Sequence, residues 1–398
     1  MPTPHPPPPL LLFDAHCHLQ DSRLSQCRAP PSTSEGETEE AESEEAEKRR
    51  WCRLDAVVAR ARASGLVGCV VCATSELDWP LVAALADRHP GFVHPSFGLH
   101  PWYLSGRKPG WEQRLEELLR SRPGAGVGES GLDKAKTTTN KSKTRRQLPS
   151  IEEQLEVLAV HARIARELRR PLTVHCVRAA GALHDALLPF RPFLKSSTSI
   201  SSPPSSSSSP PSSFSSASAP PLLLSNTCVI FHGWQGPKEE VARLSRLGEG
   251  VFFSLGARSI AKAVSAAAAA AAAATATTGG AAAAAGKSSA DDLSSVPLER
   301  LLMETDSPDG FEPLCLGEGL LAVEAEAAGG EGEGDGEGEV GEERATEREG
   351  KEKTKEKFLN QPSNVAALLP HLARAFGRDE REVARACYEN ARAVFCGE

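Results

Sequence analysis

The chain has 398 residues, of which 40% are hydrophobic, so it is long enough to bury one large core or two ordinary ones. Its net charge of −8 argues against a generally basic protein, but the acidic residues concentrate at 21–50 and 311–360 and leave the remainder mildly basic. No stretch is apolar enough to span a membrane, and the opening MPTPHPPPP lacks the features of a signal peptide. We therefore expect a protein of the cytoplasm, the nucleus or both, without membrane association.

Short apolar stretches rich in β-branched residues recur along the chain, at 10–18, 66–74, 92–100, 124–131, 171–176, 227–233, 251–256 and 300–306. Amphipathic helical patterns lie between or after them, at 53–64, 151–169, 237–248, 363–376 and 379–395. Strands that alternate with helices predict a parallel sheet. Eight such strands in roughly 250 residues predict an α/β fold of the (β/α)8 TIM-barrel type. An open doubly wound sheet is the second choice, but no GxGxxG motif follows the first strand.

Four stretches are too polar or too simple in composition to offset the entropy of ordering them: 29–48, 196–220, 265–291 and 317–357. We expect disordered insertions in the loops of one domain that spans 10–398 and follows a Pro-rich tail at 1–9. The alanine-rich stretch could instead form an additional helix, because Ala has the highest helix propensity. The acidic insertions are candidate binding segments for protein partners.

Ten cysteines are scattered through the chain, and only Cys69 and Cys72 form a CxxC motif. That motif falls within the predicted strand GCVVCAT, where residues i and i+3 point to opposite faces. We therefore exclude a metal or redox site there and expect the cysteines to be mostly small core residues.

The first predicted strand ends in LLLFDAHCHLQD, which places His16 and His18 on one face. Other metal-ligating or catalytic side chains stand at the ends of later strands, namely His100, Glu129, His175, His232 and Asp306. The carboxyl ends of the strands of a parallel barrel converge on one face, where catalytic groups gather. A single strand-end histidine is more often structural, but the whole set, in register with the predicted strand ends, indicates a metal centre.

Six of these side chains exceed the needs of one tetrahedral zinc ion and suit two divalent ions bridged by a carboxylate: His16, His18, Glu129, His175, His232 and Asp306. The four histidines favour Zn or Mn over Mg by ligand softness, and Mg stays open. No GxSxG motif or other nucleophile arrangement stands out. The residues therefore predict metal-assisted hydrolysis.

Nine strings in this chain match the motif order of a known family: FDAHCHLQD, FGLHPWY, VGESGLDK, VHCVRAAG, FHGWQG, FSLGARS, LLMETDSPD, NQPSN and YENARAVF. The chain thus resembles the TatD-type deoxyribonucleases, which belong to the amidohydrolase-like metal-dependent hydrolases, and their plant and fungal branch most closely. The resemblance spans residues 12–395 and implies cleavage of DNA phosphodiester bonds, with exonuclease action as one form.

The resemblance also implies a role for each strand-end residue. His16, His18 and Asp306 would hold one ion, His175 and His232 the other, and Glu129 would bridge them. Asp306 would also orient or deprotonate the attacking water, and Glu304 would support the site by a hydrogen bond. His100 would contact the substrate or the transition state. The family's arginine after the fifth strand is displaced by one residue here, to Arg178, which makes its phosphate contact less direct.

The loop at 134–146 adds six basic residues and no acidic one, beginning with Lys134 and Lys136. It follows the fourth predicted strand and could neutralise phosphates beside the cut, although a solvated loop is an equal alternative. Aromatic side chains near the mouth that could stack on bases are Trp102, Tyr103 and Trp234. Two other functions stay open: hydrolysis of another bond, such as an aminoacyl-tRNA ester or a small cyclic amide, and a scaffold that keeps the fold without turnover.

Overall fold

The computed structural model describes residues 9–25, 39–135, 149–194, 227–276, 293–310 and 359–396. Its centre is one sheet of eight parallel strands that are hydrogen-bonded in chain order. The strands are β1 (Leu12–Cys17), β2 (Leu66–Cys72), β3 (Val93–Phe97), β4 (Gly126–Asp133), β5 (Leu172–Val177), β6 (Val229–Phe231), β7 (Val251–Leu255) and β8 (Leu301–Met303). The sheet is a nearly closed barrel, which confirms the predicted (β/α)8 fold, and each strand overlaps the stretch predicted for it.

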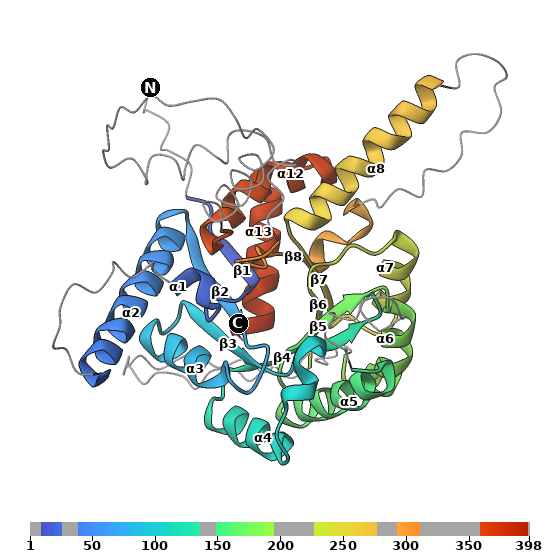
Figure 1. Ribbon diagram of the computed structural model, residues 1–398. Coiled ribbons are helices and arrows are strands. Elements are labelled where there is room, and N and C mark those ends of the chain that lie inside the picture. The colour runs from blue at the N-terminus through green and yellow to red at the C-terminus, as the bar shows by residue number, and fades with distance from the viewer. Residues whose placement is uncertain are drawn as a thin grey trace, which may run out of the picture.

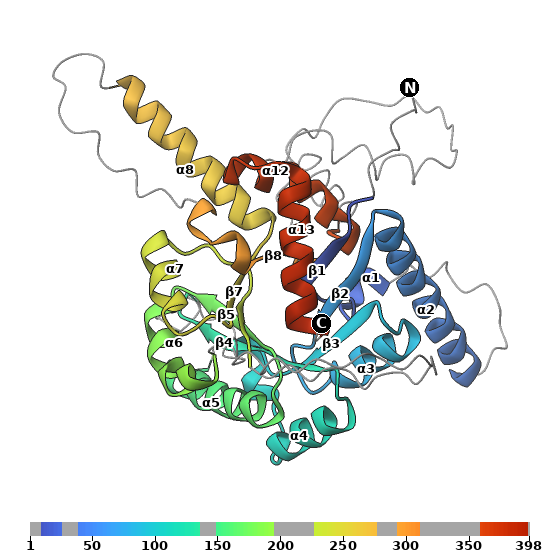
Figure 2. The same ribbon diagram turned by 180° about the vertical axis from the view of Figure 1, so that it is seen from behind.

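Helices follow one another around the outside of the barrel in chain order (Figure 1). They are α1 (Ser22–Ser25), α2 (Glu39–Ala63), α3 (Trp79–Arg88), α4 (Trp111–Ser121), α5 (Ile151–Leu168), α6 (Ala180–Leu187), α7 (Lys238–Ser245), α8 (Ala257–Ala276) and α12 (Val365–Phe376). Helix α13 (Glu380–Ala391) crosses the end of the barrel at which the strands begin (Figure 2). The Asn390 amide fixes it there by donating to the carbonyls of Leu298 and Leu301, both at 2.9 Å.

Two hydrophobic clusters stabilise this arrangement. The larger lies between the strands and the surrounding helices. The smaller joins β1, β2, β6, β7 and β8 to the C-terminal segment, where the rings of Phe13 and Phe395 stack with centroids 5.7 Å apart. Cys69 belongs to the larger cluster and Cys72 to the smaller, as expected for two strand residues that point to opposite faces. The CxxC motif is therefore part of the core. The C-terminal segment covers the end of the barrel at which the strands begin, so the end at which they finish is left for the site.

The barrel closes between its first and last strands just above the end of β8. The Asp306 N–H donates to the His16 carbonyl at 2.9 Å, and the His18 N–H donates to the Ser307 carbonyl at 2.7 Å. Strand β8 has only three residues, so these two bonds carry the pairing into the segment that follows it. The seam of the barrel consequently places the first two histidines of the chain beside Asp306.

Part of one predicted insertion is ordered, which corrects the expectation for 29–48. Residues 39–48 form the first turns of α2, whereas 29–38 lie outside the described residues. Their composition explains the difference, because Glu, Ala, Lys and Arg have high helix propensity and Glu45 lies 3.7 Å from Arg49 one turn later. Helix α8 likewise continues to Ala276, so the helical alternative holds for the first part of the alanine-rich stretch. The insertions predicted at 196–220 and 317–357 lie outside the described residues.

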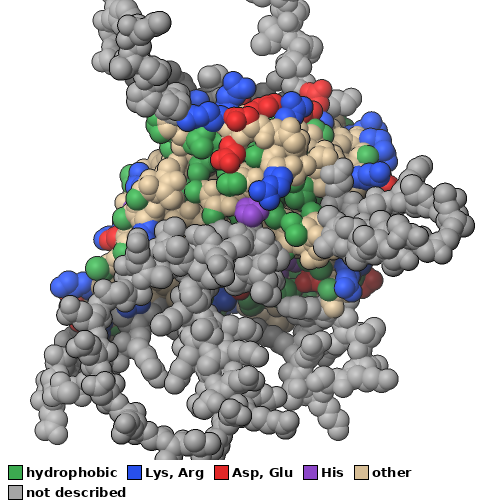
Figure 3. All heavy atoms as spheres, turned by 90° about the horizontal axis from the view of Figure 1, so that it is seen from above, with side chains coloured by type: hydrophobic (Ala, Val, Ile, Leu, Met, Phe, Trp, Pro, Cys, Tyr) green, Lys and Arg blue, Asp and Glu red, His purple; other side chains and the backbone are tan. Residues whose placement is uncertain are grey.

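The flank of the barrel that carries α8 and α12 shows Lys and Arg side chains interspersed with Asp and Glu, with hydrophobic and uncharged surface between them (Figure 3). Mixed charges of this kind create no extended field of one sign.

Candidate metal centre

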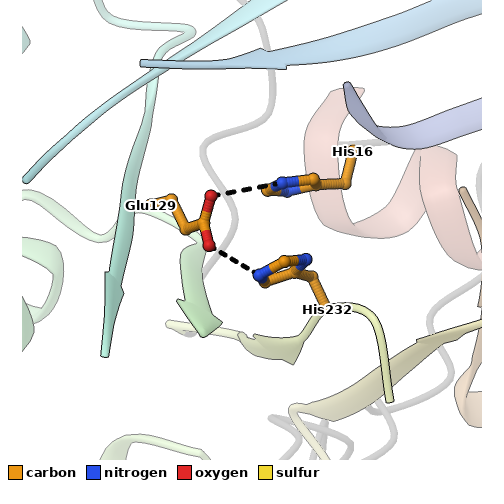
Figure 4. Close-up of side chains that lie close together, drawn as sticks. All are labelled: His16, Glu129 and His232. Atoms are coloured by element: carbon orange, nitrogen blue, oxygen red, sulfur yellow. Dashed lines mark ion pairs between the residues drawn. The ribbon is translucent and has the colours of Figure 1, made fainter. Parts of the chain in front are cut away.

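The functional side chains converge where the strands end. Glu129, which lies within β4 and is 1% exposed, is at their centre. One of its carboxylate oxygens faces His16 from β1 and the other faces His232 from the end of β6 (Figure 4). The six residues predicted as metal ligands are thereby brought together, although they lie far apart in the sequence.

Each oxygen of Glu129 serves a separate group of imidazoles. Its Oε1 lies 2.6 Å from His232 Nε2 and 2.9 Å from His175 Nδ1. Its Oε2 lies 3.3 Å from His16 Nε2 and 3.6 Å from His18 Nε2. A carboxylate shared in this way can bridge two cations.

Asp306 completes the group on the β1 side. Its Oδ1 lies 3.8 Å from His16 Nε2 and 3.6 Å from His18 Nε2, and the two Nε2 atoms are 3.1 Å apart. A bulge in β1 produces this convergence, because three residue steps from Asp14 to Cys17 face only two steps in β2. The bulge interrupts the alternation of side chains along β1. Alternation correctly predicted that His16 and His18 share a face, but it did not predict the bulge that turns this face toward Asp306.

Hydrogen bonds to the other ring nitrogens indicate which atoms are free to bind a cation. His18 Nδ1 lies 2.8 Å from the Cys72 carbonyl, to which it can only donate, so in the neutral ring the lone pair is on Nε2, which faces the cluster. His100 is arranged in the opposite way, because its Nδ1 accepts the Trp102 backbone N–H at 3.1 Å. The Nε2 of neutral His100 therefore carries a proton and lies 3.3 Å from Glu129 Oε1. His100 is thus a hydrogen-bond donor at the edge of the centre, which suits contact with substrate better than metal ligation.

The electrostatics of the cluster favour cations. Burial alone would raise the pKa of Glu129, but the surrounding imidazoles, His232 first, hold it well below its usual range. The pKa of Asp306 is likewise lowered against burial by His18 and its neighbours. The same contacts outweigh burial at His18 and raise its pKa to about 9. The two carboxylates thus stay ionised because positive charge gathers among the imidazoles, a charge that divalent ions can supply while releasing protons.

A buried aspartate that the sequence did not single out fixes the seam of the site. Asp14 accepts hydrogen bonds from the backbone N–H groups of His16 (3.2 Å) and Thr305 (2.9 Å), and from the Thr305 hydroxyl (2.6 Å). It therefore joins β1 to the residue before Asp306 and orients ligands from both strands. No local pattern pointed to Asp14, because the bulge between Asp14 and Cys17 interrupts the alternation of side chains.

Two further carboxylates support the ligand histidines from outside the cluster. Glu304 Oε1 lies 3.8 Å from His232 Nδ1 and accepts the Gly233 N–H at 2.6 Å. Asp133 Oδ2 lies 3.7 Å from His175 Nε2 and accepts the Trp102 indole N–H at 2.6 Å. Both distances exceed a hydrogen bond, so these carboxylates act on the ligating rings through their charge, which, against burial, helps to raise the pKa of His175 and His232.

We expect Trp102→Phe to weaken the second ion site without unfolding the protein. Phe keeps most of the apolar contact but removes the donor that fixes Asp133, so the negative charge beside His175 is no longer held in place. Affinity for the second divalent ion should fall by about 10-fold, the lower end of the effects of outer-shell changes. Calorimetric titration with Mn²⁺ measures this, and Trp111→Phe, a matched change away from the site, should bind both ions as the wild type does. Equal affinities in both variants would contradict the role given to Trp102.

Comparison with known proteins identifies the family of this chain. Residues 13–396 match the family of TatD related DNases. The chain belongs to this family. A Pantoea protein named 3'-5' ssDNA/RNA exonuclease TatD is 29% identical over 140 residues, which cover 35% of this chain and 50% of that protein. A protein of the same name from Edwardsiella piscicida is 36% identical over 138 residues, covering 35% of this chain and 48% of that protein. The chain thus spans about half the length of the curated relatives it matches.

Solved structures support the fold of this TatD family member. A hydrolase of the TatD family from Entamoeba histolytica superimposes with a TM-score of 0.60 at 14% identity, covering 98% of this chain and 99% of that one. Sequence identity this low establishes shared architecture and no more. The plant and fungal branch expected from the motifs stays a prediction.

Among the residues of this TatD family member predicted to bind substrate, Arg178 and Lys134 are exposed beyond the ends of β5 and β4. Lys136 and most of the basic loop at 134–146 lie outside the described residues. Of the three aromatic candidates, Trp234 is 3% exposed and packs against Phe231 and Phe253, so it is not available for base stacking. Tyr103, at 36% exposed, is available.

Proposed function

We propose that this TatD family member is a metal-dependent deoxyribonuclease that hydrolyses phosphodiester bonds. The observation that carries the proposal is the convergence of two carboxylates and four imidazoles around Glu129 at the mouth of the barrel. The names of the curated relatives favour single-stranded nucleic acid as substrate and exonuclease action as the form of cleavage.

Two divalent ions, Zn, Mn or Mg, would fit the donor set. His16, His18 and Asp306 would hold one ion and His175 and His232 the other, with one oxygen of Glu129 directed to each. Such ions supply Lewis acidity and an activated water for attack on phosphorus. The histidine-rich donor set favours Zn or Mn by ligand softness.

The remaining residues of the mouth would bind and orient the substrate. The Nε2–H of His100 is directed at the centre and would donate to a phosphate oxygen. Asp306 is held by the seam of the barrel and would orient the attacking water or accept its proton. Arg178 and Lys134 would bind phosphates further along the strand, where a charge contributes affinity but no sequence preference.

A time course of cleavage on single- and double-stranded DNA tests the function. The purified chain is stripped with chelator and resupplied with Mg²⁺, Mn²⁺ or Zn²⁺, beside His16→Ala, Asp306→Ala and, as a control, His184→Ala on the outer helix α6. We expect metal-dependent cleavage by the wild type and the control and none by the two site variants. A folded wild type that binds ions but cleaves no DNA would overturn the proposal and bring ester and amide substrates forward.

None of the helices in the described ranges is long and apolar enough to cross a membrane. Localisation to the cytoplasm or nucleus and protein partners for the acidic insertions stay predictions, as does the single domain over 10–398.

A further inference from the structure

A cavity of about 70 Å³ opens beside the metal centre. His175, His232 and Asp306 line it together with Gln235, Arg258 and Ser259. Among the described residues that line this cavity, Arg258 is the one Lys or Arg. The sequence motif FSLGARS contains it, but the alternation of strands and helices gave no reason to single it out.

The first turn of α8 holds Arg258 in a defined place. Ser259, buried beside it, accepts the Gly256 N–H on its hydroxyl at 3.3 Å. One turn later, Lys262 Nζ donates to the Gln235 carbonyl at 2.5 Å and ties the helix to the loop after β6. The backbone that carries Arg258 is therefore fixed at the edge of the cavity, while its side chain is 49% exposed.

The carboxylate of Asp306 lies between the Arg258 guanidinium and the expected position of the first ion. Arg258 Nη1 is 3.3 Å from Asp306 Oδ2, whereas the other oxygen of Asp306 faces His16 and His18. In the part of the chain the structure describes, Arg258 makes no other ion pair or hydrogen bond, so most of its five N–H donors have no partner among the described residues. An exposed ion pair of this kind contributes little to stability, so stability alone is a weak reason for the arginine.

We propose that Arg258 binds a non-bridging oxygen of the phosphate that is cut and so selects phosphodiesters over uncharged esters and amides. This inference rests on the proposed function. The planar fork of arginine matches phosphate oxygens, and a cation beside the metal centre is positioned for the charge that grows on them during cleavage. A carboxylic ester or amide presents no such charge and gains nothing from the contact.

The test compares Arg258→Gln and Arg258→Lys with Arg246→Gln, an identical charge change on an exposed residue at the opposite end of the barrel. Binding of a ten-residue thymidine oligonucleotide with phosphorothioate linkages is followed by fluorescence anisotropy at several salt concentrations, in the presence of Mn²⁺. Calorimetry measures Mn²⁺ stoichiometry in each variant. Cleavage of bis(p-nitrophenyl) phosphate and of p-nitrophenyl acetate measures selectivity.

For Arg258→Gln we expect binding weakened by about 10-fold and a salt slope reduced by about 0.7, with unchanged Mn²⁺ stoichiometry. Phosphodiester cleavage should fall at least as much, ester cleavage should not fall, and Arg258→Lys should recover the salt slope. Wild-type binding and cleavage in Arg258→Gln would overturn the inference and leave the proposed function intact. Lost Mn²⁺ binding would overturn it too, because Arg258 would then act only by positioning Asp306. A wild type that neither binds nor cleaves nucleic acid would overturn both.

Discussion

We expect Glu129→Gln to remove both ions and lower nuclease activity by on the order of 10³-fold or more, the range seen when a preorganised charge is lost from an active site. Gln has the shape of Glu, but its amide replaces one carboxylate oxygen with an N–H donor. That donor would face either His16 and His18 or His175 and His232, where a cation is expected. The negative charge that both sites share is lost in either orientation.

Metal-induced stabilisation measures this loss independently of activity. Ions that bind only the folded chain raise its melting temperature, so Mn²⁺ should stabilise the wild type and leave Glu129→Gln almost unchanged. Glu299→Gln, an exposed change of the same chemistry, should respond as the wild type does. Two ions bound to Glu129→Gln with wild-type affinity would contradict the bridging role and assign the centre to Asp306 and the histidines alone.

The sequence predicted the ligand set because each ligand follows from local pattern. His16, His175 and His232 all come at the end of a short apolar stretch, and parallel strands in a barrel present those ends on one face. The residues that it missed act across the fold. Asp14 reaches Thr305 over 291 positions and Arg258 reaches Asp306 over 48, and no period in the chain relates such pairs.

The error at the start of α2 has a different physical origin. A run of Glu, Ala, Lys and Arg is polar enough to stay unfolded, yet the same residues have the highest helix propensities. Which outcome holds depends on whether a helix already exists to extend. Trp51 packs against the larger hydrophobic cluster, and Leu54 is fully buried, so the amphipathic part of α2 supplies that beginning. Composition alone cannot reveal this dependence.

The site also depends on a close approach of two strands that only glycine permits. Gly131 in β4 pairs with His175 in β5 and has a φ of +147°. A Cβ at this position would collide with the carbonyl oxygen of His175 and lie 2.7 Å from its backbone nitrogen. Glu129 stands two residues before Gly131, so the same approach sets the separation of the bridging carboxylate and a ligand of the second ion.

We therefore expect Gly131→Ala to destabilise the protein by about 3 kcal/mol or more, because it adds steric overlap to a backbone conformation that L residues rarely adopt. Thermal unfolding should shift down by roughly 10 °C. Because β4 and β5 must separate, Mn²⁺ affinity should fall even in the molecules that remain folded. Gly124→Ala, in the turn before β4 where a Cβ meets nothing within 4 Å, should stay within about 0.5 kcal/mol of the wild type. A Gly131→Ala variant with wild-type stability and ion affinity would show that the strands can separate without disturbing Glu129 and His175.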